Sequence, residues 1–412
     1  MKILHTSDWH LGHTLFGQKR YGEFQLFLDW LKQLINDEEI DVLLVAGDIF
    51  DSSLPPNQAQ TLYYRFLNEV AQPQCPCKHI VITAGNHDSP SFLDAPRTLL
   101  SALDIHVAGR AQLPEQEVLS LKDVHGQPEL IVCAVPFLRD RDLYNAETGD
   151  TFEERDQKLL EGLKTHYQRC ASEAERQRGD HDIPVIAMGH MFVSGGRVLE
   201  DDGVRDLRVG SLGQVDASIF PSTFDYTALG HLHIPQKAGG SAYIRYSGSP
   251  IPMGFGEADQ KKQAVILETS GREITVRTVD VPRFQRLEKI SGDRATIENR
   301  LTELALSPES VWVEIVCTSD ELLSDLKERI LKRCGDNVSI LRIRMARQNL
   351  HMLEADPEQD MLEDMDVLHV FQKKLQEHFP ETPLEESPCA PLLLTFEEAL
   401  RSFQQEEESC AS

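Results

Sequence analysis

Five short polar clusters carry the side chains that could do chemistry, and each cluster follows a run of apolar residues. They contain aspartates, histidines and one asparagine, in the order Asp8-Trp9-His10, Gly47-Asp48, Gly85-Asn86-His87-Asp88, Gly189-His190 and Gly230-His231-Leu232-His233. Mixed imidazole and carboxylate ligands suit Mn, Fe or Zn better than Ca or Mg. The number of ligands exceeds the need of one ion, whereas two ions about 3.5–4 Å apart that share a carboxylate account for it.

No single cluster is specific by itself. An isolated D-x-H or G-H is more often a capped turn or a surface histidine, and an isolated Asn86 is more often a turn residue. The signal is that all five clusters stand at the ends of expected strands. Polar groups at the carboxyl ends of strands in an α/β sheet meet in one crevice, so the sequence predicts a two-metal site there.

The apolar runs before the clusters predict an α/β domain with a largely parallel sheet, because strand, polar loop, helix and strand alternate. Strands are expected at residues 2–5, 42–46, 79–84, 130–135, 184–188 and 225–229. Apolar residues at helical spacing predict helices at 24–35, 59–70 and 152–171. Three hairpin-like runs between residues 243 and 281 predict a second, antiparallel sheet.

The sequence changes character after residue 281. A strand, a helix and a strand are expected at 311–316, 321–333 and 338–343, which together form a compact βαβ unit. Two apolar stripes at helical spacing follow near 361–379 and 392–403, with prolines between them. The βαβ region also holds a group of basic residues, Lys327, Arg329, Lys332, Arg333, Arg342, Arg344 and Arg347. Such a group is most often a solvated helix face, with contact to DNA as the alternative.

Charge and cysteine pattern exclude several classes of protein. The 412 residues suit two or three domains, and the net charge of −26 argues against a basic protein that coats DNA. Half of the net negative charge, −13, lies in residues 351–412. The 8 cysteines are irregularly spaced, which predicts a reduced, cytoplasmic protein. No stretch approaches the roughly 18 apolar residues of a membrane span, so no membrane association is expected.

The order of the clusters carries a family resemblance. The series D-x-H, G-D, G-N-H-D, G-H and G-H-x-H resembles that of the calcineurin-like metallophosphoesterases. The stretches ILHTSDWHLG, VAGDIFDSSLPP, ITAGNHDSP, ALGHLH and YSGSPIP are similar to the SbcD family of bacterial SbcCD nucleases, counterparts of the archaeal and eukaryotic double-strand-break repair nuclease. The resemblance implies a four-layer αββα sandwich at 1–282, a small α+β cap that helps hold DNA at 283–347, and an acidic helical tail at 348–412.

The resemblance also implies a role for each candidate site residue. Two divalent ions, expected to be Mn²⁺, would share Asp48 as a bridging ligand. One ion would be held by Asp8, His10, Asp48 and His233, and the other by Asp48, Asn86, His190 and His231. In this family pattern His87 is not a ligand. It would face the scissile phosphate, neutralise developing charge and protonate the leaving oxygen.

Asp51 departs from the pattern of the archaeal nucleases, where a second histidine stands four residues after the glycine of G-D. An aspartate at that place resembles the phosphatase branch of the superfamily. Two interpretations remain open from the sequence. The carboxylate of Asp51 orients His87 and holds its proton, or it caps the helix that begins near Pro55 and Pro56.

Other residues near the clusters have simpler interpretations. Asp88 is expected to fix its loop by backbone hydrogen bonds, and Trp9 is expected to pack in the core. His5 precedes the first ligand and is a candidate for the layer behind the metals. Ser247 and Ser249 most simply belong to a tight turn, with a phosphate contact as the alternative.

The function expected from the resemblance is that of a DNA nuclease subunit in repair and recombination. It would act as an exonuclease on duplex DNA and as an endonuclease on single strands and hairpins, dependent on ATP through an SbcC-like coiled-coil ATPase. A homodimer within a heterotetramer is expected. The alternatives are a metallophosphatase or cyclic-nucleotide phosphodiesterase and, in a different class, a non-catalytic clamp subunit. The extension after residue 281 favours the nuclease, and the intact ligand set with His87 argues against the clamp.

Overall fold

The structure is a computed structural model that describes residues 1–144, 151–196, 214–318, 335 and 337–345, and six positions of the tail, 371, 375, 392, 393, 395 and 396. The chain forms two compact units, Met1–Ala346 and Arg347–Ser412. The first unit contains all of the candidate site residues.

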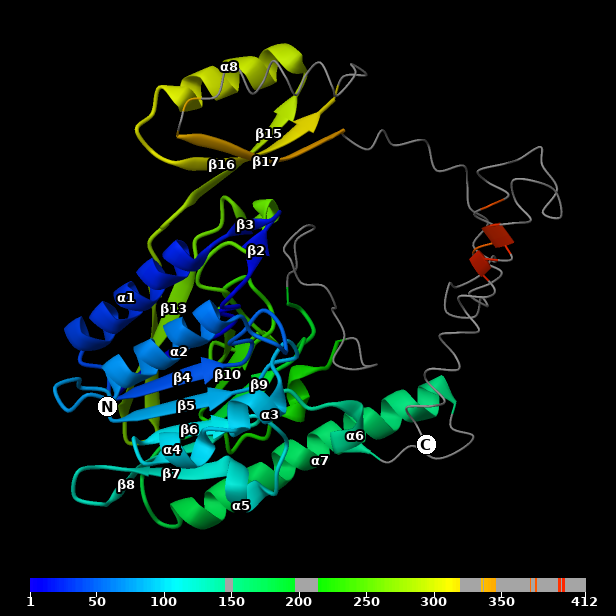
Figure 1. Ribbon diagram of the computed structural model, residues 1–412. Coiled ribbons are helices and arrows are strands. Elements are labelled where there is room, and N and C mark those ends of the chain that lie inside the picture. Colours follow the sequence, from blue (N-terminus) through cyan, green and yellow to red (C-terminus); the bar gives the residue numbers. More distant parts are fainter. Residues whose placement is uncertain are drawn as a thin grey trace. The chain divides into compact units, whose positions relative to one another are not determined.

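The first sheet is mostly parallel and has an antiparallel hairpin at one edge (Figure 1). Its strands, in spatial order, are β14 (Glu273–Asp280), β13 (Gln263–Ser270), β1 (Lys2–Thr6), β4 (Val42–Ala46), β5 (His79–Thr83) and β6 (Ile105–Ala108). Strands β1, β4, β5 and β6 are parallel, and β13 is antiparallel to both β1 and β14. The predicted strands at 2–5, 42–46 and 79–84 are therefore confirmed to within a residue.

The second sheet is also mixed, with four parallel strands at its centre. Its strands, in spatial order, are β11 (Gln236–Lys237), β12 (Ile244–Tyr246), β10 (Tyr226–Gly230), β9 (Val185–His190), β8 (Pro128–Cys133) and β7 (Val118–Lys122). The expectation of a separate antiparallel sheet at 243–281 was wrong. The first run, β12, pairs in parallel with β10, whereas β13 and β14 extend the first sheet beside β1.

Helices cover the two outer faces of the paired sheets, which gives the predicted four layers. α1 (Tyr21–Asp37) and α2 (Asn57–Val70) pack on the first sheet, and α7 (Phe152–Arg178) packs on the second (Figure 1). Short helices complete the connections: α3 (Pro90–Asp94), α4 (Arg97–Ser101), α5 (Pro114–Glu117) and α6 (Asp140–Leu143). A third core lies between the two sheets. Strand β4, with sequence VLLVA, is buried throughout because its alternate residues face two different cores.

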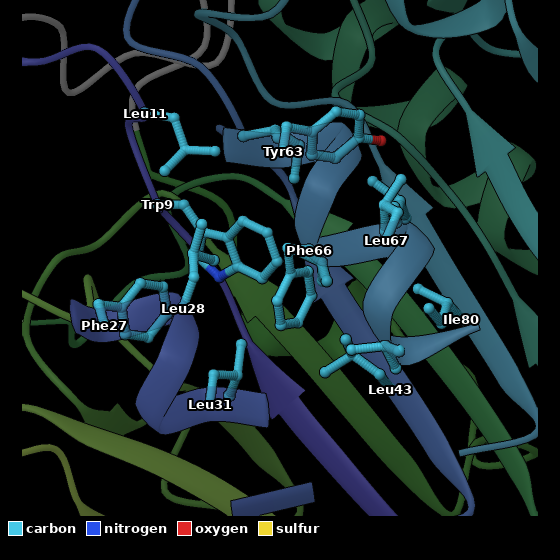
Figure 2. Close-up of a cluster of buried hydrophobic side chains, with 14 of the residues drawn as sticks. Trp9, Leu11, Phe27, Leu28, Leu31, Leu43, Tyr63, Phe66, Leu67 and Ile80 are labelled. Carbon is cyan, nitrogen blue, oxygen red and sulfur yellow. The ribbon is translucent and has the colours of Figure 1, made fainter. Parts of the chain in front are cut away.

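The core beneath α1 and α2 is built around Trp9, as Figure 2 shows. The indole ring makes edge contacts with Phe27 of α1 and Phe66 of α2, with ring centroids 5.8 and 5.4 Å apart. Its Nε1 donates a hydrogen bond to Thr6 Oγ1 at 3.1 Å. The expectation that Trp9 packs in the core is confirmed. Because Trp9 stands between Asp8 and His10, its packing anchors the turn that carries both.

A small three-stranded sheet follows the sandwich within the first unit. Its parallel strands lie in the order β15 (Arg286–Gly292), β16 (Val311–Cys317) and β17 (Val338–Met345), and α8 (Arg294–Ala305) packs against them. Strands β16 and β17 match the prediction. Sequence reasoning missed β15 and α8, although Asp293 caps α8 by accepting a hydrogen bond from the Thr296 amide. The predicted helix at 321–333 lies outside the described residues.

The tail is described at only six positions, so the two predicted helices as a whole lie outside the described residues. Phe371 from the first stripe stacks on Phe396 from the second, with ring centroids 3.9 Å apart and planes 7° apart. Leu375 is buried. The two stripes therefore contact each other through these rings.

Candidate metal centre

The predicted ligands all lie at or just beyond the carboxyl ends of parallel strands, which brings them to one edge of the two facing sheets. Asp8 and His10 follow β1, Asp48 follows β4, Asn86 follows β5, His190 ends β9, and His231 and His233 follow β10. The aspartates and histidines of this set are buried, with exposed fractions of 0–4%. Asn86 and His87 are half-buried.

The backbone at the site is strained at several ligand positions. Asp8, His10, Asp48 and His231 have positive φ angles of 53°, 47°, 52° and 102°. Residues other than glycine rarely adopt this conformation, and it persists where the surrounding structure enforces it. Such residues gather at functional sites, and here four of them come from strands of two different sheets. The geometry therefore supports a site whose ligands are held in place by the fold.

Glycines at the same edge allow the strand ends to approach one another. A Cβ atom on Gly85 would fall inside contact distance of the Asp48 carboxylate and amide. Gly47 has a φ of 83°, and a Cβ there would collide with the His190 ring. Glycine is required at both positions because any side chain would displace a candidate ligand.

One half of the centre brings together residues from β1, β4 and β10. His10 Nε2 lies 3.2 Å from His233 Nε2 and 3.6 Å from Asp48 Oδ2. Ligand atoms of Asp8, His10 and His233 lie within 4.8 Å of one another. Asp8 also accepts hydrogen bonds from the His231 amide at 2.8 Å and from Ser7 Oγ at 2.5 Å, which fix its carboxylate.

The other half brings together residues from β4, β5, β9 and β10. His190 Nε2 lies 3.0 Å from Asn86 Oδ1 and 3.2 Å from Asp48 Oδ2. His231 Nδ1 lies 3.1 Å from the same amide oxygen of Asn86. The Asp48 carboxylate thus approaches ligands of both halves. Its second oxygen, Oδ1, accepts a hydrogen bond from the His87 amide at 2.9 Å.

Two histidines are oriented by groups behind them. His190 Nδ1 lies 3.0 Å from the Ala46 carbonyl oxygen, which can only accept, so Nδ1 carries a proton and Nε2 is the nitrogen that faces the site. His233 Nδ1 lies 3.2 Å from Glu257 Oε1. A histidine that binds metal through one nitrogen generally donates its other N–H in this way.

Glu257 and Lys262 are functional residues that sequence reasoning missed. Both are buried, and the Lys262 ammonium donates to the Glu257 carboxylate, to the His233 carbonyl oxygen at 3.0 Å and to Ser249 Oγ at 2.9 Å. Glu257 also accepts a hydrogen bond from the Met253 amide at 3.0 Å. An ion pair therefore lies directly behind the first half of the centre.

The electrostatics of the site act in opposite directions on two of its histidines. Burial alone would lower the pKa of His190, but the Asp48 carboxylate outweighs it and raises this pKa to about 9. Burial and the nearby His190 lower the pKa of His231 to about 3. Although burial alone would raise it, the pKa of Asp48 is held well below its usual range by His190 and His10. The carboxylate is therefore charged, and protonation of His190 competes with metal binding.

The residues present fit a pair of divalent ions. Nitrogen and oxygen atoms with lone pairs face one another at 3.0–3.6 Å across both halves. Nε2 of His231 is buried and has no hydrogen-bond partner among the described residues. Close approach of such atoms is unfavourable without cations between them, whereas imidazole, amide and carboxylate donors together suit transition-metal ions.

His87 is oriented by Asp51, through the main chain. His87 Nδ1 lies 3.0 Å from the Asp51 carbonyl oxygen. The Asp51 carboxylate instead lies 2.9 Å from His13 Nδ1 and 3.5 Å from His10 Nδ1. The interpretation in which the carboxylate holds His87 is therefore corrected. The capping interpretation is also corrected, because α2 follows Pro56 with no side-chain cap.

Comparisons with known proteins agree with this geometry. The calcineurin-like phosphoesterase family matches residues 1–235, and the SbcD_C family, described as type 5 capsule protein repressor C-terminal domain, matches residues 283–379. The chain is 36% identical to the SbcD protein of the SbcCD nuclease from Escherichia coli strain K12, over 91% of this chain and 92% of that protein.

Two further relatives carry the same name. The Rhodobacter capsulatus protein is 32% identical over 80% of this chain and 86% of its own length. The Bacillus subtilis protein is 37% identical over 68% of this chain and 69% of its own length. This chain belongs to the SbcD family. Its sandwich is a calcineurin-like metallophosphoesterase domain, which makes the protein a metal-dependent phosphodiester hydrolase of the nuclease type.

Asp88 has the structural role expected of it near the SbcD-family centre, whereas the contact found for His5 is with a tyrosine. Asp88 accepts hydrogen bonds from the amides of Ile49, Phe50 and Gly85 at 2.9–3.1 Å, which confirms that it fixes the loop. His5 is buried and lies 3.1 Å from the Tyr226 hydroxyl, not from a candidate ligand.

The two serines of the predicted turn are also internal. Ser247 Oγ lies 2.8 Å from Ser7 Oγ, and Ser249 bonds to Ile251 and Lys262. Both serines are completely buried, so they support the loop from within. The tight-turn interpretation, not the phosphate contact, agrees with this arrangement.

Among the described residues, no helix combines the length and the apolar character that crossing a bilayer requires.

Proposed function

We propose that this chain is the nuclease subunit of an SbcCD-type complex that hydrolyses DNA phosphodiester bonds in repair and recombination. The observation that carries the proposal is the convergence of two facing ligand groups on Asp48, with His87 beside them. The relatives are named as components of the SbcCD nuclease, and this supports DNA as the substrate. Both exonuclease action on duplexes and endonuclease action on single strands and hairpins belong to the proposal, as does a cytoplasmic location.

Each half of the centre is proposed to hold one ion, with Mn²⁺ as the expected metal. The first set comprises Asp8, His10, Asp48 and His233, and the second comprises Asp48, Asn86, His190 and His231. When bound, such a pair supplies an activated nucleophile and neutralises charge on the phosphate. The chain contributes rigid ligand positions and excludes water behind them, because the aspartates and histidines of both sets are buried.

His87 is proposed as the acid that serves the leaving oxygen. Its Nδ1 proton is committed to the Asp51 carbonyl oxygen, so Nε2 is the nitrogen that exchanges a proton. The amide of His87 also donates to Asp48, which ties the position of the imidazole to the ligand pair. Asp51 acts in this proposal as a positioning residue, since it holds His87 through its main chain and His10 and His13 through its carboxylate.

Replacing His87 with alanine tests this role. The rate of hydrolysis of linear DNA and of bis-p-nitrophenyl phosphate should fall by about 10²–10⁴-fold, because a positioned general acid contributes on that order. Metal content, measured by elemental analysis, should stay at the wild-type value. Wild-type turnover, or a loss of metal, would contradict the assignment. Activity on p-nitrophenyl phosphate that exceeds activity on the diester would favour a phosphatase instead.

The tail is proposed to bind a coiled-coil ATPase, through which DNA cleavage depends on ATP, with two nuclease subunits in a heterotetramer. Residues 351–412 carry a net charge of −13 and would repel DNA, whereas apolar stripes suit a groove on a partner protein. The alternative is that the two apolar stripes pack on each other and not on a partner, as the stacking of Phe371 on Phe396 indicates. The domain division 1–282, 283–347 and 348–412 belongs to the same proposal.

Truncation after residue 347 tests the docking role. Hydrolysis of bis-p-nitrophenyl phosphate with Mn²⁺ should persist, because the metallophosphoesterase domain is intact. Copurification with the ATPase and ATP-stimulated cleavage of duplex DNA should be lost. A full-length Phe371→Asp chain is the matched variant and should copurify less well. Normal copurification of the truncated chain would refute the docking role.

The cap is proposed to contact DNA, but two of its arginines have structural partners. Arg342 and Arg344 bind the buried carboxylate of Glu314 at 3.3 and 3.1 Å, and the Arg342 guanidinium lies 4.8 Å from the centre of the Phe16 ring. The ion pairs with Glu314 join β17 to β16, and the contact of Arg342 with Phe16 joins the cap sheet to the β2–β3 hairpin, Thr14–Leu15 and Gln18–Lys19. The remaining residues of the basic group, Lys327, Arg329, Lys332, Arg333 and Arg347, lie outside the described residues.

A further inference from the structure

Strand β5 has a second group of potential metal ligands at its amino end, opposite to the end that carries Asn86. His79 is the first residue of β5, and His106 lies in β6 directly beside Val81. Side chains two residues apart on a strand share a face, so His79 and His106 lie on the same face of neighbouring strands. About 13 Å of strand separates His79 from Thr83, after which the loop of the candidate metal centre begins.

His79 is buried in a way that leaves one nitrogen without a partner. Its exposed fraction is 8%. Nε2 lies 3.0 Å from the Lys122 carbonyl oxygen, which can only accept, so Nε2 carries the proton and Nδ1 keeps the lone pair. Within the described part of the chain, Nδ1 has no hydrogen-bond partner. A buried acceptor without a donor is unfavourable, and some group is therefore expected to meet it.

His106 and Asp104 lie close to His79. Ligand atoms of His79, Asp104 and His106 all fall within 4.8 Å of one another, and the two imidazole centroids are 6.3 Å apart. The Asp104 carbonyl oxygen accepts a hydrogen bond from the Ile80 amide at 3.1 Å, which holds Asp104 beside β5. Asp104 is exposed and His106 is half-buried, so the group is open to solvent on one side.

The geometry points to a metal site of the Zn²⁺ type formed by His79, Asp104 and His106, separate from the centre around Asp48. Imidazole and carboxylate ligands bind Zn²⁺ at about 2.0–2.2 Å, and small side-chain rotations bring three atoms within 4.8 Å of one another to such distances. The hydrogen bond between His79 Nε2 and the Lys122 carbonyl is the support that a metal-binding histidine generally has.

Nearby positive charges are occupied by other partners and do not compete for the three ligands. Lys78, which precedes His79, forms an ion pair with Asp41 at 3.0 Å. Arg97, whose charge acts on His106, donates to Gln112 Oε1 at 2.6 Å. An ion here would join β5 to β6 at the end of the sheet remote from catalysis. Its expected effect is therefore on stability and not on turnover.

The site is tested by counting bound Zn²⁺ in the full-length protein. Metal-stripped wild type, His106→Gln and Asp104→Asn are dialysed against Zn²⁺ and analysed for metal and protein. The matched control is His125→Gln, an exposed histidine in the turn between β7 and β8. We expect His106→Gln to bind one equivalent less than wild type. Asp104→Asn, an exposed position that should not perturb folding, should bind that equivalent at least about 10-fold more weakly.

A further variant, Asp48→Ala, is compared with these proteins to separate this site from the proposed catalytic centre. Asp48→Ala should keep the equivalent that His106→Gln loses, and hydrolysis of bis-p-nitrophenyl phosphate with Mn²⁺ should be unchanged in His106→Gln, Asp104→Asn and His125→Gln. Zn²⁺ should raise the melting temperature of the Asp48→Ala variant. It should not raise that of the double variant Asp48→Ala, His106→Gln. Equal metal counts in wild type and His106→Gln would overturn the proposal, as would an equal loss in His125→Gln.

Discussion

The two halves of the candidate metal centre are held in place by different means. His190 is oriented by a main-chain carbonyl, that of Ala46 in the centre of a sheet, at 3.0 Å. His233 is oriented by the side chain of Glu257, which in turn is bound by the buried Lys262. The first support is a main-chain carbonyl, so it does not depend on which residue type stands at position 46. The second depends on two side chains whose charges must both be buried.

This difference implies that the two halves respond differently to substitution. No side-chain replacement removes the carbonyl of Ala46, so the support behind His190 cannot be deleted by substitution as the support behind His233 can. The His233 half can be disturbed from behind, without touching a ligand. Burial alone would raise the pKa of Glu257, but Lys262 and His233 lower it to about 2, so the carboxylate stays charged at neutral pH.

The largest effect is expected where the two halves meet. Asp48→Ala removes the carboxylate that approaches His10 at 3.6 Å and His190 at 3.2 Å. Both metal equivalents of the centre should be lost, and hydrolysis of DNA should fall to background. Elemental analysis and a nuclease assay measure the two outcomes. If the variant kept both ions and full activity, Asp48 would not be a bridge, and the division into halves would be wrong.

A smaller effect, confined to one half, is expected from Glu257→Gln. The amide keeps the size of the side chain but loses the charge that supports His233, which should weaken metal binding in that half by about 10–100-fold. Isothermal titration with Mn²⁺ should show one weakened and one unchanged equivalent. Glu257→Gln leaves the buried Lys262 ammonium without its carboxylate partner, and the double variant Glu257→Gln, Lys262→Met is the control because it removes that charge as well. Equal weakening of both equivalents would remove the distinction between the halves.

The smallest effect is expected from Trp9→Phe, which changes the packing beneath the first half. The ring contacts with Phe27 and Phe66 would be partly kept, and the hydrogen bond to Thr6 would be lost. Urea unfolding should show a loss of stability of about 1–3 kcal/mol, the usual range for a core replacement. Turnover with saturating Mn²⁺ should change little, since Asp8 and His10 remain. A loss of metal binding larger than the loss of stability would show that Trp9 positions the ligands directly.

The same contrast explains how much could be predicted from sequence. Asp48 and His190 are recognisable because each directly follows a run of apolar residues, and parallel strands bring such positions to one edge. Glu257 and Lys262 have no such signal. They lie in a segment interpreted as hairpins, and only the folded chain brings their side chains against His233.

Two other features required the structure for related reasons. The contact of Asp51 with His13 depends on the conformation of the loops that carry them, and residue types alone do not reveal that conformation. The metal-type group at His79 depends on the register between β5 and β6, which places His106 beside Val81. Strand β15 was missed because its sequence, RLEKISG, mixes charged and apolar residues without a strong run.

The pairing of β1 with β13 has a consequence for synthesis of the protein. Ile3 lies opposite Leu267, and Asp8 at the end of β1 needs His233 as its neighbour in the first half of the centre. At about 5–20 residues per second, a ribosome takes roughly 10–50 s to pass from Ile3 to Leu267. Throughout that interval the nascent amino-terminal strands have one apolar edge without its partner strand. Loading of the first half with metal must therefore follow the emergence of most of the chain, and chaperones that shield these strands should influence the yield of metal-loaded protein.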